Sequence, residues 1–285
     1  MRESGSPRAR IARTVPLATS ILHPTDFSGA SERAFADALA IAVLSGARLD
    51  ILHAGRSLAD DWERFPAVRR TLERWGLLEP GSPRSAVFER LGVAVTKLEP
   101  KGSAARACLR AIHEIDPDLV VLATEGREGV ARWLRPSVAE AVAHRTAAAT
   151  LFVPARGRGI VSLADGAIAL ERILVPVADR PAPDIAVDRA EQVAHAFHPE
   201  HAEITALRVN GPAPSLRVGD QPGLSWRRES ARGDAIEEIL RAADRSDLIV
   251  MATEGTHGTW DALRGSTTSQ VVRAAPCPVL AVPAG

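Results

Sequence analysis

The chain has few cysteines and no long hydrophobic run. Its 285 residues include only Cys108 and Cys277, which form no CxxC pair. That count fits a reducing cytoplasm, and each thiol is expected to be a small core residue. No apolar run approaches the ~20 residues that span a bilayer, and the arginine-rich residues 1–19 lack the hydrophobic segment of a signal peptide. We therefore expect a cytoplasmic protein with a frayed N-terminal tail and no membrane partner.

The chain also lacks an excess of charge of either sign. It carries 35 basic and 35 acidic residues, which gives no reason to expect a nucleic-acid partner.

The motifs GxSxG, HExxH, GxGxxG and GxxxxGK[ST] are absent. The sequence therefore contains no motif that would indicate a hydrolase, a zinc protease, a dinucleotide-binding protein or a Walker-type nucleotide-binding protein. We expect no catalytic residues, and at most a weak hydrolysis of ATP.

What the chain does contain is an apolar run followed by a glycine loop. Residues 248–251 read Leu-Ile-Val-Met, which is typical of a strand in the middle of a parallel sheet. Gly255 and Gly265 follow, and Ser266 and Thr267 stand where a helix would begin. Glycine lets the backbone approach an anion, and a helix start offers unpaired N–H donors. The segment is a candidate phosphate-binding loop, although an ordinary strand-to-helix loop has a similar composition.

The same landmarks occur twice in the chain. They are Ile-Leu-His-Pro at 21–24 and Ile-Leu-Val-Pro at 173–176, Ala-Thr-Glu-Gly-x-x-Gly at 123–129 and 252–258, and Thr-Leu-Phe-Val-Pro at 150–154 and Val-Leu-Ala-Val-Pro at 279–283. Three matched landmarks in one order indicate an internal duplication. The unit is too long for a solenoid repeat, so two copies of one domain are predicted.

Apolar runs and helical patterns alternate in both halves. In the first half, strands are expected at residues 21–25, 49–53, 93–98, 119–122 and 150–153, with helices from Ser28 or Ser31 to about Leu44, at 104–115 and at 137–144. In the second half, strands are expected at 173–177, 204–209, 224–229, 248–251 and 279–282, with helices at 185–197, at 235–243 and after the glycine loop. Residues 57–90 should add a charged helix, whose aromatic stripe from Trp62 to Trp75 covers the core, and then a Pro/Gly loop at 80–83. This alternation predicts a mostly parallel sheet with helices on both faces.

The domain organisation follows from the two copies. We place a tail at residues 1–19, a first domain at 20–156, a linker at 157–171 and a second domain at 172–285. In the linker, two alternating apolar runs flank Asp165-Gly166, a pair that favours a tight β-hairpin turn. The linker should therefore hold the two halves in a fixed relation.

Three segments of the chain resemble the universal stress protein family. They are Pro-Thr-Asp-Phe-Ser at 24–28, the small-residue loop after each fourth strand, and Cys-Pro-Val-Leu-Ala-Val-Pro at 277–283. The resemblance covers almost the whole chain and implies two open, five-stranded α/β domains of the adenine nucleotide hydrolase-like type. Because members usually dimerise through the last strand, it implies that the halves pair as an intramolecular pseudo-dimer. It leaves open a further homodimer and the identity of protein partners.

The nucleotide-binding branch of this family carries Gly, two residues, Gly, nine residues, Gly and then Ser or Thr. In the second half these positions hold Ala252, Gly255, Gly265 and Ser266. The nucleotide-binding residues that the resemblance implies for the second domain are Val177, Val209, Ala252, Gly255, Gly265, Ser266 and Thr267. The implied ligand is ATP or another adenine nucleotide, with or without magnesium.

The first half departs further from the family pattern. Its positions hold Ala123, Gly126, Pro136 and Ser137, and Pro136 has no N–H to donate to a phosphate. The family aspartate after the first strand is Asp26 here, whereas Ala178 stands at that place in the second half. The degenerate first-domain site comprises Thr25, Asp26, Ala54, Ala123, Gly126 and Ser137. Glu125 and Glu254 lie inside the two loops and would repel phosphate unless they turn outward or face a metal.

These features leave different classes of function open. The first is a stress-response sensor or regulatory module that binds an adenine nucleotide at the second glycine loop. The second is a nucleotide-independent scaffold on which the paired halves present a surface to other proteins. A weaker alternative is a small-molecule or metal binder that uses the altered loop of the first half.

The histidines offer little support for a metal. His195, His198 and His201 stand three apart, but Pro199 interrupts their helix, so we predict a solvated helix end and no metal site. His23 lies on the first strand, where we expect a buried, hydrogen-bonded side chain.

Overall fold

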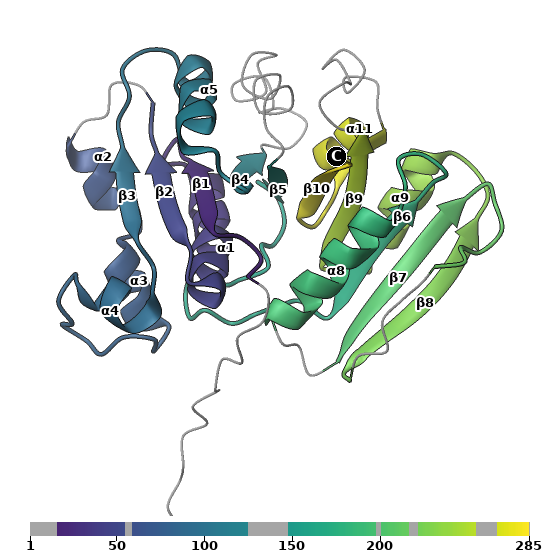
Figure 1. Cartoon of the computed structure of the whole chain (residues 1–285), viewed down its shortest axis with the longest axis horizontal. Coiled ribbons are helices and arrows are strands. Elements are labelled where there is room, and N and C mark those ends of the chain that lie inside the picture. Colours follow the sequence, from purple (N-terminus) through teal and green to yellow (C-terminus); the bar gives the residue numbers. More distant parts are fainter. Residues whose placement is uncertain are drawn as a thin grey trace, which may run out of the picture.

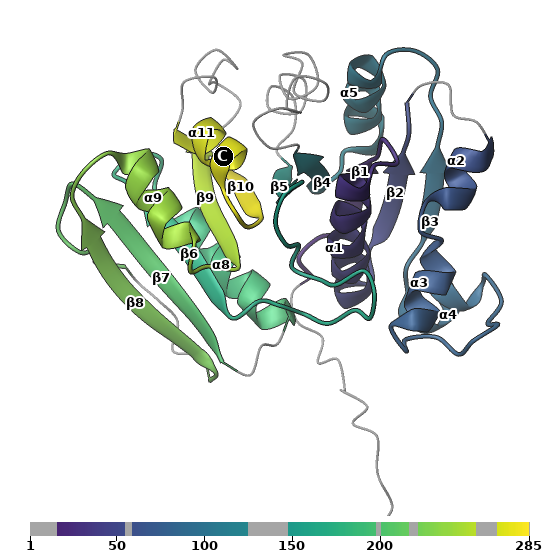
Figure 2. The same cartoon turned by 180° about the vertical axis from the view of Figure 1, so that it is seen from behind.

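The strands of the chain form one continuous sheet. The structure is a computed structural model that describes residues 16–54, 59–124, 148–197, 201–216, 222–254 and 267–284. Its ten strands have the order β3-β2-β1-β4-β5-β10-β9-β6-β7-β8. The first-half strands lie on one side of the molecule and the second-half strands on the other, as seen from the front in Figure 1 and from behind in Figure 2. The predicted α/β class is confirmed.

The elements of the two halves follow the same sequence. The first half contains β1 (Ser20–Pro24), α1 (Gly29–Ser45), β2 (Arg48–Leu52), α2 (Ala59–Arg64), α3 (Val68–Arg74), α4 (Ala86–Leu91), β3 (Val95–Leu98), α5 (Ala104–Ile115), β4 (Leu119–Thr124) and β5 (Ala149–Pro154). The second half contains β6 (Arg172–Val177), α8 (Asp184–Phe197), β7 (Ala202–Val209), β8 (Leu224–Ala231), α9 (Ala235–Ala243), β9 (Leu248–Glu254), α11 (Thr267–Ala274) and β10 (Val279–Ala284).

The two halves join through their last strands. Within each half all neighbouring strands are parallel. At the junction β5 and β10 pair antiparallel, with Leu151 opposite Leu280. This is the intramolecular pairing that the sequence led us to expect.

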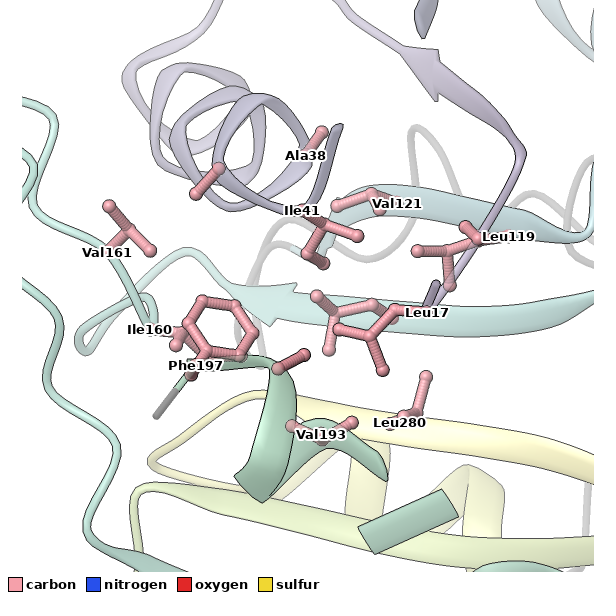
Figure 3. Packing of buried hydrophobic residues seen from close by; sticks show 14 of the residues in the cluster. Leu17, Ala38, Ile41, Leu119, Val121, Ile160, Val161, Val193, Phe197 and Leu280 are labelled. Atoms are coloured by element: carbon pink, nitrogen blue, oxygen red, sulfur yellow. The ribbon is translucent and has the colours of Figure 1, made fainter. Parts of the chain in front are cut away.

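Helix α1 is determined by local signals and then buried by the second half. The Ser28 side chain accepts a hydrogen bond from the Ser31 N–H at the start of the helix, as an N-cap residue does. Gly46 ends the helix at φ 62°, where its N–H bonds back to the last turn. One apolar cluster includes residues from both α1 and α8, and Figure 3 shows Ile41 of α1 near Val193 and Phe197 of α8. The core is therefore shared between the halves.

The opposite face of the sheet is covered separately in each half. Leu22 packs with Cys108 and Ile112 of α5, whereas Leu174 packs with residues of α9 and α11. Both cysteines are buried, and burial raises the pKa of each thiol to about 12. The expectation that they are core residues is confirmed.

The prediction of one charged helix within residues 57–90 was wrong. They form three short helices, α2, α3 and α4, and not one charged helix. Pro66 disfavours a helical backbone at Phe65, and Gly76 and Gly81 take positive φ values of 70° and 82° that end the next segment. The aromatic stripe nevertheless covers the core, since Phe65 is buried and Trp62 packs against the same cluster.

The linker also differs in detail from the expected tight turn. Val161 and Ile168 form a single antiparallel bridge, and Ser162 N–H donates to the Ala167 carbonyl at 2.9 Å. The loop between them is therefore longer than a two-residue turn. Gly166 has φ +76° and lies against the Trp75 ring, where a Cβ would come within 2.7 Å of Cγ. The glycine is thus required by a tertiary contact.

A buried carboxylate holds the linker to α1. Asp37 is fully buried, and its Oδ1 accepts a hydrogen bond of 2.8 Å from the Val161 N–H. Its Oδ2 has no hydrogen-bond partner among the described residues. Burial raises the pKa of this carboxyl to about 7, because desolvation disfavours the charged form more than the backbone donors of Ile160 and Val161 favour it.

An aspartate holds the start of the first strand in each half. Asp118 accepts hydrogen bonds from Thr19 N–H at 2.8 Å and Ser20 N–H at 3.2 Å. Asp247 accepts them from Glu171 N–H at 3.0 Å and Arg172 N–H at 2.8 Å. Each aspartate directly precedes the fourth strand of its half. This equivalence is a further mark of the duplication.

Within the described part of the chain, no helix has the length and apolarity needed to cross a membrane. The helix expected at 137–144 lies outside the described residues.

Candidate functional site

Each half has a point where the sheet order changes direction. This point lies between β1 and β4 in the first half and between β6 and β9 in the second. Ligands of open α/β sheets bind outside the carboxyl ends of the strands at such a switch point. We call the carboxyl ends of β1 and β4, with residues 25–28 and 53–54, the first switch point. The second switch point comprises the carboxyl ends of β6 and β9, with residues 178–180 and 208–211.

The strands at both switch points stop pairing before they end. In the first half only Ile21 and Leu22 of β1 are in register with β4. In the second half only Ile173 and Leu174 of β6 are in register with β9, although β6 continues to Val177. Strands that separate toward their carboxyl ends leave backbone groups available to a ligand.

The second switch point brings together part of the predicted site. Val177 ends β6 and is buried, Val209 ends β7 and Ala252 lies in β9, both half-buried. Thr267 is exposed and is the first residue of α11, which lies by the carboxyl end of β9 (Figure 1). The predicted residues Gly255, Gly265 and Ser266 lie outside the described residues.

The first switch point holds the remaining predicted residues. Thr25 is fully buried, and its N–H donates to the Leu52 carbonyl at 2.8 Å. Asp26 follows it, and Ala54 and Ala123 are half-buried near the ends of β2 and β4. Gly126 and Ser137 lie outside the described residues, as do Glu125 and Pro136.

The Asp26 carboxylate is occupied by the start of α1. Its Oδ1 accepts hydrogen bonds from Ser28 N–H at 3.0 Å, Ser28 Oγ at 2.5 Å and Ser31 Oγ at 2.6 Å. A ligand hydroxyl that approached this oxygen would have to compete with these three donors. The family aspartate is thus present but is used in capping the helix.

Aromatic side chains fill the space beside Asp26. Phe27 adopts φ 62°, a left-handed conformation that is rare for a bulky residue. Its ring stacks on His53 at 4.1 Å between centroids, and Trp62 packs edge-on at 4.9 Å. The His53 Nδ1 lies 2.9 Å from the Thr25 carbonyl oxygen. The contact between Phe27 and His53 could not be predicted from the sequence, because no residue spacing links the segments that follow β1 and β2.

The equivalent positions of the second half carry an ion pair instead. Pro24 is in register with Leu52, and Pro176 is in register with Leu207. Counting onward from these matched prolines, Phe27 corresponds to Asp179 and His53 to Arg208. Arg208 Nη2 lies 2.7 Å from Asp179 Oδ1. The matched prolines in the sequence relate Phe27 to Asp179, whereas relating His53 to Arg208 needs the strand register.

His23 is buried as expected. Its Nδ1 lies 2.9 Å from the Val121 carbonyl oxygen, and desolvation lowers the pKa of the imidazole to about 4. Its neutral ring packs between Phe35 and Phe65. His23 is therefore a core residue beneath the first switch point.

The described residues contain no cluster of three or more His, Cys, Asp or Glu side chains that could hold a metal ion. His198 lies outside those residues.

Comparison with known proteins gives the family. The sequence model of the universal stress protein family matches residues 18–154 and 219–283. The chain belongs to the universal stress protein family. The two matches fall in the two halves, in agreement with a tandem member of this family. A search of curated proteins finds no match.

Solved structures of similar fold come from the same family. A universal stress protein from Archaeoglobus fulgidus is 17% identical with a TM-score of 0.61, over 95% of this chain and 99% of its own. A putative universal stress protein from Pseudomonas aeruginosa is 16% identical with a TM-score of 0.54, over 93% of each chain. A universal stress protein in complex with cAMP is 23% identical with a TM-score of 0.31, over 47% of this chain and 95% of its own. The first two span both halves, which supports the tandem fold.

Proposed function

We propose that this universal stress protein binds ATP or another adenine nucleotide at the second switch point and acts as a nucleotide-dependent regulatory module. The observation that carries the proposal is the arrangement of β6, β9 and α11. Pairing between β6 and β9 stops after Leu174 and Ile249, and α11 begins at Thr267 on the same edge of the sheet. Between β9 and α11 the sequence carries Gly255, Gly265 and Ser266.

The chemistry of this edge suits a phosphate group. A helix start presents N–H groups without intrahelical partners and the positive end of the helix dipole. The proposed contacts are the backbone at Ala252, Gly255 and Gly265, the hydroxyls of Ser266 and Thr267, and apolar contacts from Val177 and Val209. The loop contains no lysine but one arginine, Arg264, and a bound magnesium ion would add further positive charge. We propose binding without efficient hydrolysis.

The first switch point is proposed not to bind nucleotide. Asp26 is engaged by Ser28 and Ser31, and Phe27, His53 and Trp62 pack on one another beside it. Pro136 in the following loop lacks a backbone donor. The first half would therefore support the second through the shared core and the β5–β10 junction.

The test is a calorimetric titration of the full chain with ATP and magnesium. We expect one nucleotide per chain for the wild type and for Gly126→Arg, and no binding for Gly265→Arg. The two substitutions place the same bulky side chain in matching loops, so each is the control for the other. Retained binding in Gly265→Arg, or loss in Gly126→Arg, would contradict the assignment of the site to the second half.

A nucleotide-independent scaffold is the second candidate. It is favoured by the continuous ten-stranded sheet and shared core, which hold the halves together without a ligand. Native mass spectrometry of protein purified without added nucleotide distinguishes the two. A co-purified adenine nucleotide supports the regulatory module, whereas an unliganded chain that also fails to bind ATP supports the scaffold.

A further inference from the structure

A cavity lies at the junction of the two halves, on the face of the sheet that α1 and α8 cover. Its walls are apolar side chains from both halves, together with one charged side chain, that of Arg189. Figure 3 shows three of the wall residues, Leu17, Ile41 and Val193, in the shared core. The cavity is small, about 20 Å³, which is room for one water-sized group. Because apolar walls leave such a space dry, it suits the end of an aliphatic chain.

Leu17, from the segment that precedes β1, forms one wall of this cavity. Leu17 is 7% exposed and Ala18 is 2% exposed. Among the described residues, the one hydrogen bond to Leu17 comes from Arg189, whose Nη1 donates to the Leu17 carbonyl at 2.9 Å. The next bond along the chain is at Thr19, where the N–H donates to Asp118 at 2.8 Å. Leu17 is therefore held by its burial and a single hydrogen bond, so a better-matched group could replace it.

The charge of Arg189 has no carboxylate in contact with it among the described residues. Burial lowers the pKa of its guanidinium, because desolvation disfavours the charged form. Asp118 is near enough for its charge to oppose this effect, but its carboxylate already accepts hydrogen bonds from Thr19 and Ser20. A desolvated cation is stabilised by an anion paired with it. The junction therefore favours an anionic group beside Arg189.

We propose that the junction binds a short branched aliphatic carboxylate, which takes the place of Leu17. Leu17 itself has the shape of such a ligand, because its carbonyl oxygen meets Arg189 and its isobutyl group adjoins the cavity. A carboxylate would give Arg189 a charged acceptor, and charge-assisted hydrogen bonds are roughly twice as strong as neutral ones. Its chain would also fill the space that Leu17 leaves empty. This inference does not depend on nucleotide binding.

The test is a calorimetric titration of the full chain with isocaproate, which is leucine without its amino group. Isohexyl alcohol has the same chain without the charge and is the neutral control ligand. The proteins are the wild type, Arg189→Gln, Leu17→Ala and Arg241→Gln. Arg241 is the control arginine, because it is exposed, pairs with Glu238 on α9 and does not line the cavity.

We expect Arg189→Gln to weaken isocaproate binding about tenfold or more and to leave alcohol binding within about twofold. Leu17→Ala should tighten the binding of both ligands, by about tenfold for isocaproate, because a smaller side chain has to be displaced. Arg241→Gln should change the affinity for neither ligand.

Three outcomes would overturn the proposal. The first is a wild type with no saturable binding of isocaproate up to about 10 mM. The second is an equal loss of both ligands in Arg189→Gln, because that pattern indicates a structural role for Arg189. The third is binding by Leu17→Ala alone, which would show that the native Leu17 is not displaced. None of these outcomes bears on the proposed function, which an ATP titration of the same proteins measures separately.

Discussion

The two switch points share a backbone arrangement and differ in their side chains. In both, the first strand and the fourth strand pair only near their amino ends. In the first half, Phe27 stacks on His53. In the second half, Asp179 pairs with Arg208 at the matching positions. Stacked rings therefore lie at the first edge where an ion pair lies at the second.

The difference indicates which parts of a duplicated domain were free to diverge. The aspartates before β4 and β9 make the same backbone contacts in both halves, because each fourth strand must be held beside its first. The residues after the strands do not share this requirement, and they make different contacts in the two halves: Phe27 stacks on His53, whereas Asp179 pairs with Arg208. The two copies therefore share the contacts at the start of the strands and differ in the side chains at the carboxyl ends.

The largest effect is expected at the strand-start aspartates. Asp247 is buried, and besides two backbone N–H groups it pairs with Arg158 of the linker and with Arg172. Asp118 makes comparable backbone contacts at an exposed site. We expect Asp247→Ala to lower the free energy of unfolding by about 3 kcal/mol and Asp118→Ala by about 1 kcal/mol. Urea unfolding of the two variants measures these free energies. Equal losses would contradict the expectation that Asp247 stabilises its half more than Asp118 does.

The next effect concerns the pH dependence of stability. Asp37 has a pKa raised from 3.8 to about 7, so ionisation in the unfolded chain makes stability fall as the pH rises between these values. His23 has a pKa lowered from 6.5 to about 4, so stability rises with pH between about 4 and 6.5. The two slopes oppose each other in the wild type.

Asp37→Asn removes one of these slopes. We expect the variant to gain stability as the pH rises from 4 to 6.5, and to exceed the wild type by about 2 kcal/mol at pH 8. Thermal unfolding across this pH range is the measurement. A variant whose pH profile overlays that of the wild type would show that Asp37 is ionised in the folded protein.

Substitutions at Phe27 and Asp179, the matching positions where the switch points differ, are expected to change the free energy of unfolding less. Phe27→Ala removes a stacked ring and leaves alanine at a positive φ, so we expect a loss of about 1–2 kcal/mol. Asp179→Ala, at the matching position, breaks an exposed ion pair and should cost less than about 0.5 kcal/mol. Denaturant midpoints of the pair test the comparison, and a larger loss for Asp179→Ala would reverse it.

The smallest effect concerns the alanines that replace the first glycine of the family motif. Ala252→Gly removes a methyl group where a phosphate would approach the backbone, so we expect ATP to bind more tightly by less than about tenfold. Ala123→Gly is the matched change in the first half and should leave the affinity and the stoichiometry unchanged. A second bound nucleotide in Ala123→Gly would show that the first switch point is accessible after all.

Much of the fold was predictable because its signals are local. The bounds of α5 and α9 agree with the helices predicted from the apolar spacing, and the Asp234 side chain also caps α9. The division of residues 57–90 into three helices was missed, since the aromatic stripe continues across Pro66. The linker turns back at Asp165-Gly166 as predicted, but through a loop longer than two residues, and the packing of Gly166 on Trp75 could not be predicted because Trp75 is far away in sequence.

The candidate site was predictable only in part. Family resemblance implied Val177, Ala252 and Thr267 as binding residues, and the structure places them at the end of β6, in β9 and at the start of α11. It could not give the contacts of Asp26, Phe27 or Arg208, which depend on residues brought near by folding. The assignment of nucleotide binding to this edge remains a prediction.

The order of strands and helices, the caps of α1 and the doubling of the unit were all determined by the sequence itself, since hydrophobic period and capping act over a few neighbouring residues. Tertiary structure alone decided that β5 meets β10, that Asp37 holds the linker and that Arg208 meets Asp179. Each of these contacts joins segments far apart along the chain, and the packing of two halves around one core determines which of them meet.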